Sequence, residues 1–314
     1  MVVTNEDDQV VVTVCICTFR RASILCAIES VARQTLPEGL SVRILVIDND
    51  DAPTAKEAIA NFCVKSGISV DYRHAPGRNI SIARNAALDA VSSPWIAFID
   101  DDERASSDWL VKLFSARAGA HAVFGPSEAL YGHDVPSWIR AGDYHSNRVP
   151  DKEDPILTGY TSNALIDVEF VRKHGLRFDP ALGRTGGEDT IFFYALRWKG
   201  GVLRYARDAV VYEPVVPHRV NVRWIAARRY RAGQAYAMMF RDFDRVRYWK
   251  VACTAPLKIV ACICASAAMA LSPKRAMWWS MRGIFHLGAL SLAVGARVYE
   301  EYSSAETPIV YRDS

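Results

Sequence analysis

A run of carboxylates follows an apolar stretch at residues 95–103 (WIAFIDDDE). The apolar part is typical of a buried strand, and the strand ends in Asp100, Asp101 and Asp102. Because side chains alternate along a strand, Asp100 and Asp102 can point the same way and offer paired oxygens to one hard divalent cation, Mg²⁺ or Mn²⁺. A cation held there could bind a diphosphate. The alternative for the same residues is an acidic turn that caps the next helix.

The elements that position these carboxylates alternate along the first hundred residues. Strands are predicted at residues 10–17, 42–48, 68–73 and 95–100, and helices at 21–34, 54–64 and 80–91. This alternation predicts an α/β fold with a mostly parallel, Rossmann-like sheet. Ligands of such sheets bind beyond the carboxyl ends of the strands, where residues 18–20 (TFR), 48–50 (DND) and 100–102 fall.

Several motifs and function classes are excluded or disfavoured. No GxGxxG follows the first strand and no GxxxxGK[ST] occurs, so dinucleotide and P-loop sites lose their main support. The net charge of +3 over 314 residues is too small to imply nucleic acid, and we expect no such partner. The N-terminal residues, MVVTNEDDQ, lack the basic start and apolar core of a signal peptide, so we expect the following domain to stay unexported.

Two later segments complete the pattern. Residues 126–160 are rich in proline and polar residues and are predicted to form a long loop, either a lid or an ordinary insertion. Residues 161–175 return to an ordered pattern. The glycine-rich run 183–187 (GRTGG) then precedes the acidic pair Glu188 and Asp189, which opens a predicted helix over 188–199.

Taken in order, the motifs CTFRR, VIDND, GRNISIARN, FIDDDE, GGED and RRYRAGQ resemble glycosyltransferase family 2, whose fold is GT-A, the nucleotide-diphospho-sugar transferase fold. The resemblance covers roughly residues 10–235. It is strongest to bacterial enzymes that extend the lipid-linked repeat units of exopolysaccharides such as succinoglycan. Processive synthases of the family carry QxxRW, and this chain has RRYRAGQ in the matching region. That departure favours the addition of a single sugar.

The resemblance implies a set of donor-binding residues. Thr18 and Arg20 would lie beside the nucleotide, and Asp48 would hydrogen-bond its base or ribose. Arg78 and Arg84 would neighbour the uracil and the diphosphate. From the residues alone, Asp48 could instead cap a turn, and Arg84 could be a solvated helix residue.

The resemblance also implies a catalytic centre. Asp100 and Asp102 would frame the metal site, with Asp101 on the donor side, and the cation would neutralise the leaving diphosphate. Asp189 is the candidate general base of an inverting transfer, and Glu188 would orient the acceptor. Acids at this position could also serve to complement the helix dipole.

Three basic residues beyond position 217 have weaker assignments. His218 follows a strand-like run and is predicted to close on the metal or the diphosphate, although a lone histidine can be purely structural. Arg228 and Arg231 lie on a helical stretch that resembles the arginine-rich segment contacting the diphosphate or the acceptor in this family. The alternative is a solvated basic face, or one that touches anionic lipid.

Apolar residues dominate the C-terminal part of the chain. The stretch 251–272 is interrupted by Lys258, and the stretch 283–296 has 14 uncharged residues, whereas a spanning helix needs about 20. Because Trp249, Trp278 and Trp279 flank these stretches together with basic residues, we expect a helical hairpin in or dipping into the cytoplasmic leaflet. The alternative is two buried helices that pack on the catalytic domain or on a second copy.

These observations predict a GT-A domain over residues 10–247, a hydrophobic membrane-associated helical region over 248–302, and tails at 1–9 and 303–314. The expected activity moves a hexose from a UDP-sugar donor to a hydroxyl of a polyprenyl-diphosphate-linked saccharide. The expected place is the cytoplasmic face of a bacterial inner membrane, with peripheral or monotopic attachment. A sugar-nucleotide pyrophosphorylase would carry a Gly-rich loop after the first strand, unlike CTFRR. An inactive membrane adaptor would be expected to lose Asp102 or Asp189, and both are present.

Overall fold

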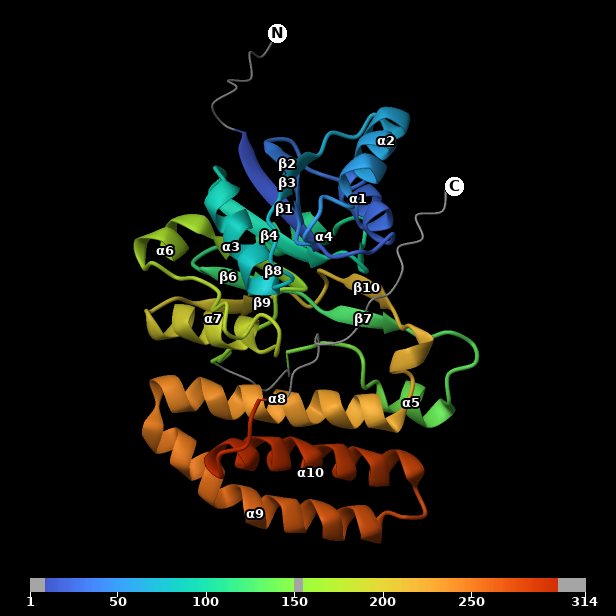
Figure 1. Cartoon of the computed structure of the whole chain (residues 1–314), viewed down its shortest axis with the longest axis vertical. Helices are drawn as coiled ribbons and strands as arrows, with labels where there is room; N and C mark the ends of the chain where they lie inside the picture. Colours follow the sequence, from blue (N-terminus) through green and yellow to red (C-terminus); the bar gives the residue numbers. More distant parts are fainter. Residues whose placement is uncertain (1–8, 150–154, 299–314) are drawn as a thin grey trace.

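The computed structural model describes residues 9–149 and 155–298. Its centre is a seven-stranded sheet with the strand order β3-β2-β1-β4-β8-β6-β9 (Figure 1). The first four neighbours run parallel, as the sequence predicts, and are β3 (Asp71–His74), β2 (Leu40–Asp48), β1 (Val10–Thr18) and β4 (Trp95–Asp100). The helices that return the chain between them are α1 (Ile24–Ala32), α2 (Lys56–Ser66) and α3 (Ile80–Ala90).

The parallel strands are apolar throughout because helices cover both faces of the sheet. On one face, Val14 and Ile16 of β1 join the same buried cluster as Ile24 and Ile28 of α1. On the other face, Cys15 belongs to the cluster that includes the buried alanines of α3. Helix α3 begins at a capped position, since the Asn79 side chain accepts hydrogen bonds from the backbone amides of Ser81 and Ile82. This burial fixes the direction in which the strand ends point.

The second half of the sheet is mixed. Strand β8 (Asn163–Asp167) is antiparallel to both β4 and β6 (Ala122–Phe124), and β9 (Leu203–Tyr205) is parallel to β6. The buried Asn163 side chain joins three segments, because its Oδ1 accepts from Trp109 Nε1 at 2.8 Å and its Nδ2 donates to the carbonyls of Pro126 and Ala209. The helices of this half are α4 (Trp109–Ser115), α6 (Val168–Lys173) and α7 (Glu188–Trp198).

A small second sheet lies beside the carboxyl end of β4. It has the order β5-β10-β7 and consists of β5 (Arg104–Ala105), β10 (Val211–Pro214) and β7 (Ser127–Leu130). Strand β7 and helix α5 (Ser137–Gly142) fall within residues 126–160, so the prediction of one long loop there was wrong in part. Residues 150–154 of that segment lie outside the described residues. The 3₁₀ turn η2 (Pro217–Arg219) follows β10 and leads into the C-terminal helices.

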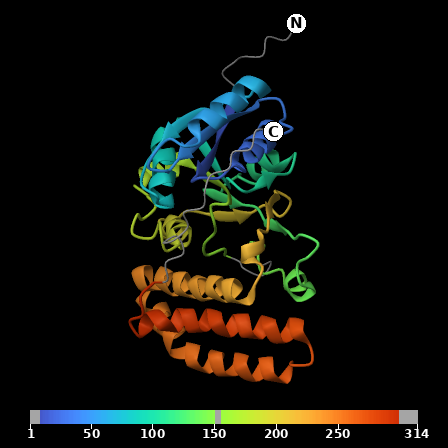
Figure 2. The ribbon, with the colours of Figure 1, turned by 45° about the vertical axis from the view of Figure 1, so that its right-hand side comes forward.

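Three long helices form a layer at the end of the molecule farthest from α2 (Figures 1 and 2). They are α8 (Val222–Phe243), α9 (Arg245–Ala268) and α10 (Pro273–Ala293), and α10 lies between the other two. Helices α8 and α10 approach each other at two glycines. A Cβ atom on Gly288 would lie 1.9 Å from the carbonyl oxygen of Tyr230, and one on Gly233 would lie 2.0 Å from that of Phe285. Helix α10 therefore packs closely against α8.

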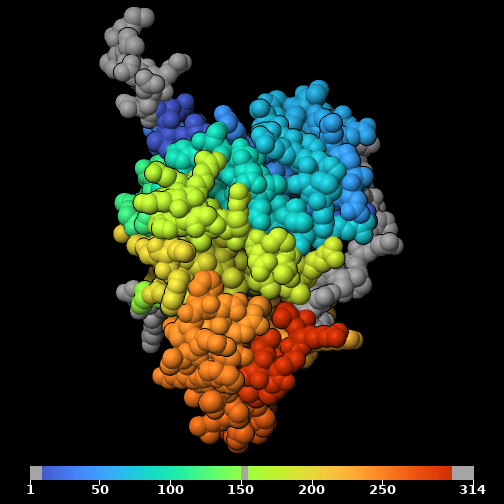
Figure 3. All heavy atoms as spheres, turned by 60° about the vertical axis from the view of Figure 1, so that its left-hand side comes forward, coloured from blue at the N-terminus to red at the C-terminus, as the bar shows by residue number. Residues whose placement is uncertain are grey.

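Helix α9 forms the outer surface of this layer, at the orange end of the molecule in Figure 3. Large apolar side chains on it are exposed, including Leu257 at 74%, Val260 and Ile263. Within the described residues, α9 is the one helix that is long and apolar enough to cross a membrane by length and composition, and only 17% of its most apolar window is buried. The helix continues for 24 residues through Pro256 and through Lys258, the residue that interrupts the apolar stretch in the sequence.

Candidate active site

The carboxyl ends of β1 and β4 are neighbours. This places Thr18, which is predicted to border the nucleotide, beside residues 100–102, the acidic turn. The hydroxyl of Thr18 donates to Asp101 Oδ2 at 2.7 Å. Burial raises the pKa of Asp101 to about 7, although the nearby Arg21 guanidinium acts in the opposite direction. The turn is anchored from below by the buried Glu103, which accepts from the Asp100 amide at 3.1 Å and from Ser127 of β7 at 2.6 Å. The acidic turn is thus rigidly held between two sheets.

Arg84 connects the acidic turn to the acidic pair of α7. It is buried, with 7% of the residue exposed, and lies over the ring of Phe178. Its guanidinium forms an ion pair with Glu188 and reaches to 4.0 Å from Asp100 Oδ1. Burial alone would lower the pKa of Arg84, but the carboxylates, Glu188 first, outweigh burial and raise that pKa above its usual range. Arg84 is therefore a buried, permanently charged link and not a solvated helix residue.

The loop before α7 sets the position of Asp189. At the start of this loop, a Cβ atom on Gly183 would lie 1.8 Å from Asn79 Oδ1, so the loop packs directly against the start of α3. At its end, Gly186 and Gly187 have φ values of 80° and 91°, a left-handed conformation that glycine adopts without steric cost. Asp189 follows in the first turn of the helix. Burial and then the neighbouring Glu188 raise its pKa to about 7, and Arg84 opposes them.

Asp48 has its oxygens engaged within the turn that follows β2. Its Oδ2 accepts from the Ala55 amide at 3.0 Å and from the Tyr72 hydroxyl at 2.7 Å, and its Oδ1 accepts from the Asp50 amide at 3.1 Å. This is the turn-capping arrangement that the sequence left open. In the ladder between β1 and β2, Asp48 is the direct partner of Thr18, so the two predicted donor residues lie side by side at the sheet edge, while the Asp48 side chain bonds within its own turn.

Arg20 and Arg78 lie on the loops that surround this turn. Arg20 Nε lies 2.8 Å from Asp50 Oδ2, and Arg78 Nη2 lies 2.7 Å from Asp51 Oδ2. Both arginines adopt the left-handed backbone conformation, which usually requires glycine, with φ values of 53° and 47°. Such conformations cost about 1–3 kcal/mol and cluster at functional sites. Backbone strain is thus present at two positions where the sequence predicts nucleotide contacts.

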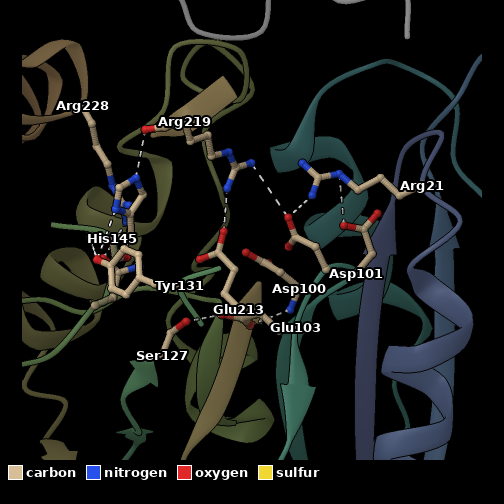
Figure 4. Close-up of polar contacts among 12 residues, drawn as sticks. Arg21, Asp100, Asp101, Glu103, Ser127, Tyr131, His145, Glu213, Arg219 and Arg228 are labelled. Carbon is tan, nitrogen blue, oxygen red and sulfur yellow. Dashed lines mark hydrogen bonds and ion pairs between the residues drawn. The ribbon is translucent and has the colours of Figure 1, made fainter. Parts of the chain in front are cut away.

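His218 and its neighbour Arg219 occupy different positions. His218 is exposed on η2, whereas Arg219 Nη2 lies 3.9 Å from Asp102 Oδ2 and its Nη1 lies 2.6 Å from Glu213 Oε1 (Figure 4). Burial and then Asp102 raise the pKa of Glu213. The sequence analysis assigned no role to Arg219, Glu213 or Arg21. A signal for Arg21 was present, because it is the second arginine of CTFRR.

Arg228 and Arg231 turn from α8 toward the loops of the α/β domain. Arg228 donates to the carbonyl of His145 at 3.1 Å and to Asn147 Oδ1 at 2.9 Å, and the His145 ring stacks on Trp224 with centroids 5.0 Å apart. Arg231 lies beside the glycine loop, since a Cβ atom on Gly186 would be 3.5 Å from its Nη1. Both arginines therefore belong to the interface between α8 and the site.

Whether the acidic turn can bind a cation depends on the side-chain oxygens that it offers as ligands. Among the described residues, no group of three or more His, Cys, Asp or Glu side chains is arranged to hold a metal ion. Asp100 and Asp102 nevertheless supply carboxylate oxygens at one turn, and Mg²⁺ characteristically binds through one or two carboxylates together with water and phosphate oxygens. The positive charge beside Asp102 comes from Arg21 and Arg219. The acidic turn therefore fits a hard divalent cation that shares its ligands with a phosphorylated substrate.

Comparison with known proteins agrees with this geometry. The model of glycosyl transferase family 2 matches residues 13–175. The chain is 36% identical over 295 residues to the succinoglycan biosynthesis protein ExoM of Rhizobium meliloti (strain 1021), covering 93% of this chain and 95% of that protein.

Solved structures share the fold. A mannosyltransferase, PcManGT from Pyrobaculum calidifontis in complex with GDP-Man and Mn²⁺, superposes with a TM-score of 0.60 at 16% identity, covering 89% of this chain and 86% of that chain. The S. aureus protein TarS (1–349) in complex with UDP-GlcNAc gives a TM-score of 0.51 at 12% identity, covering 88% and 92%. The predicted GT-A-like α/β fold, with a mostly parallel mixed sheet and a C-terminal helical region, is confirmed.

Proposed function

The chain belongs to glycosyltransferase family 2, and on that premise we propose that it is an inverting, metal-dependent hexosyltransferase that uses a UDP-sugar. The observation that carries this proposal is the chain of contacts from Asp100 through Arg84 to the acidic pair Glu188 and Asp189. It connects a turn whose carboxylates suit a cation to Asp189, whose pKa is raised to about 7. A transfer that expels a diphosphate needs both groups in one site.

The proposed roles follow from the chemistry of each group. Asp189 accepts the proton of the acceptor hydroxyl as that hydroxyl attacks the anomeric carbon from the side opposite the diphosphate. Asp100 and Asp102 would hold a divalent cation, which would neutralise the charge of the leaving diphosphate. Arg84 holds Glu188 in place beside the base, so that Glu188 can orient the acceptor. Thr18 and Arg20 border the nucleotide on the β1 side.

We propose that the acceptor is a saccharide carried on a polyprenyl diphosphate and that the product belongs to an exopolysaccharide or cell-surface glycan. The similarity to a succinoglycan biosynthesis protein supports this acceptor class. Helix α9 supports it independently, because an exposed apolar face on the outermost helix suits contact with a lipid surface. In this proposal residues 10–247 carry out the donor chemistry, and residues 248–302 hold the enzyme on the cytoplasmic leaflet.

A donor screen tests the activity. Purified protein is incubated with Mn²⁺ and a panel of UDP-sugars and GDP-sugars, and release of free nucleotide diphosphate is measured with and without a lipid-linked acceptor extract. We expect one UDP-hexose to give release that increases with the acceptor. Release from no nucleotide sugar, or from GDP-sugars alone, would refute the proposed donor class.

A further inference from the structure

Asp102 lies between two guanidinium groups that come from opposite sides of the site. Arg21, on the segment after β1, forms an ion pair with Asp102 Oδ2 and also lies 3.5 Å from Asp101 Oδ1. Arg219, on η2, reaches the same Asp102 oxygen at 3.9 Å. Figure 4 shows Arg21 and Arg219 approaching the acidic turn from its two sides. These two guanidinium groups therefore balance the charge of the Asp102 carboxylate.

These contacts compete directly with a cation. A divalent ion that binds Asp102 takes up the oxygen that Arg21 and Arg219 share, and two positive groups at one oxygen repel each other. A guanidinium stays protonated in proteins. Arg21 therefore cannot relieve the repulsion by losing its proton. It has to move.

The two arginines differ in their freedom to move. Arg219 keeps a second partner, because its Nη1 lies 2.6 Å from Glu213 Oε1 and both side chains are largely buried. Arg21 is 37% exposed at its side chain, and its partners are carboxylates of the acidic turn itself. Its guanidinium can thus leave the turn without breaking another part of the fold. A diphosphate offers it two oxygens in the planar geometry that arginine recognises.

On the basis of the proposed function, we propose that Arg21 holds the place of the cation at Asp102 and transfers to the donor diphosphate when the cation binds. Arg219, fixed by Glu213, stays and marks the far wall of the diphosphate pocket. A cation alone must displace Arg21 without giving it a new partner. A cation together with a diphosphate satisfies every charge, so the two ligands favour each other's binding through Arg21, and the coupling is reciprocal.

Titration calorimetry of Mn²⁺, with and without saturating UDP, tests this coupling in the full-length protein. For Arg21→Met we expect Mn²⁺ alone to bind about tenfold more tightly than to the wild type, and the enhancement by UDP to fall by about tenfold, within the usual range of coupling between sites. Arg21→Lys keeps the charge without the planar guanidinium. Its Mn²⁺ affinity should therefore lie between those of the wild type and Arg21→Met. Arg33→Met is the matched control, because Arg33 forms an exposed helical ion pair with Glu29.

The outcomes separate the two proposals. If the wild type binds UDP with Mn²⁺ but both Arg21 variants show unchanged or weaker Mn²⁺ binding and an unchanged UDP enhancement, Arg21 is not the placeholder. If the wild type itself binds neither UDP nor Mn²⁺, the proposed function fails, and the inference fails with it. Circular dichroism of each variant confirms that folded proteins are being compared, and Arg21→Lys provides the comparison if the methionine variant does not fold.

Discussion

Two carboxylates at the start of α7 have different surroundings. Glu188 forms a buried ion pair with Arg84, whereas Asp189 accepts a hydrogen bond from the backbone amide of Thr190 and has a pKa of about 7. Active sites commonly assign acid and base roles by such differences in environment. On the proposed function, we therefore expect Glu188 to be held in place by Arg84 and Asp189 to act as the proton acceptor.

The pH dependence of transfer should report the ionisation of Asp189. Only the deprotonated carboxylate accepts a proton, so we expect kcat/KM to increase about tenfold per pH unit below pH 7 and to level off above it. The measurement is a pH profile at constant ionic strength with a saturating cation. A profile that is flat from pH 5 to pH 8 would contradict the assignment.

Asp189→Asn removes the proton acceptor while keeping the size of the side chain. We expect transfer to fall by about 10²–10⁴-fold with donor affinity nearly unchanged, and the acidic limb of the pH profile to disappear. Turnover assays and UDP-sugar titrations measure the two effects. Asp89→Asn is the control, because Asp89 forms an exposed ion pair with Arg177. Normal turnover in Asp189→Asn would move the base to another carboxylate, with Glu188 tested next.

Asp102→Ala should abolish the dependence of UDP binding on Mn²⁺. The variant leaves the cation with one carboxylate fewer and leaves the diphosphate charge unneutralised. Calorimetric titration with UDP, in the presence and absence of Mn²⁺, measures this dependence. Asp108→Ala, at a half-buried position before α4 whose carboxylate pairs with Lys112, serves as the comparison. If UDP affinity still responds to Mn²⁺ in Asp102→Ala, residues 100–102 are better interpreted as a turn that caps the next helix than as a metal site.

At the scale of elements, α8 connects the site to the outer helices. Its residue Arg231 lies beside the glycine loop that precedes α7, and its Gly233 lies against α10. Since α10 buries one face of α8, removal of the chain beyond residue 247 would uncover that face. Point substitutions therefore separate the functions of these helices better than truncation does.

Gly288→Ala should destabilise the protein. The added Cβ would lie 1.9 Å from the carbonyl oxygen of Tyr230, and because this is backbone, the helices would have to move apart. Overpacking of this kind costs about 1–3 kcal/mol, and we expect a Tm several degrees lower by differential scanning calorimetry. Gly132→Ala, where nothing lies within 4 Å, should leave the Tm unchanged. Equal Tm values for the two variants would show that the contact between α8 and α10 can relax freely.

The sequence predicted those elements whose signals are local. Strands β1, β2 and β4 and helix α3 fall within a few residues of their predicted positions, because each carries its own apolar period and its own end signals. Strand β3 is shorter than predicted. The antiparallel insertion of β8 beside β4 was not predicted, since no local pattern states which edge a later strand joins. Strand β7 and helix α5 were missed because short elements among prolines give a weak period.

The same limit applies to the site. The predicted residues Thr18 and Asp101 meet because neighbouring parallel strands end at one edge, which topology alone implies. The contacts of Arg21 and Arg219 with Asp102 join segments that are far apart in the chain. The motif CTFRR contains Arg21, but the partner that an arginine reaches depends on tertiary packing, and no spacing in the sequence identifies Asp102 as that partner.

At the scale of the whole molecule, α9 and α2 lie at opposite ends of the long axis (Figure 1). An enzyme attached through α9 would hold its sheet away from the lipid, with α8 and α10 between them. The basic residues near the N-terminal ends of α9 and α10 would favour an anionic leaflet, and they are Arg245, Arg247, Lys250, Lys274 and Arg275.

The double variant Leu257→Glu and Ile263→Glu places two charges on the exposed face of α9. We expect its flotation with vesicles containing anionic lipid to fall at least several-fold, while UDP-sugar hydrolysis in solution stays close to that of the wild type. Val64→Glu is the control, because Val64 is 86% exposed on α2, at the other end. If the double variant floats as well as the wild type, the exposed face of α9 does not bind the vesicles. A change in the oligomeric state of the variant would then show that this face contacts a second copy of the chain.

The late arrival of β8 has a consequence for synthesis of the protein on the ribosome. When β4 is complete, the four parallel strands can already assemble, but one edge of β4 has no neighbour until β8, which begins at Asn163, 63 residues after Asp100. At about 5–20 residues per second, that edge stays uncovered for roughly 3–13 s. An uncovered apolar strand edge recruits other strands. Nascent chains stalled between residues 110 and 160 should therefore aggregate or bind chaperones, and chains that extend past β9 should not.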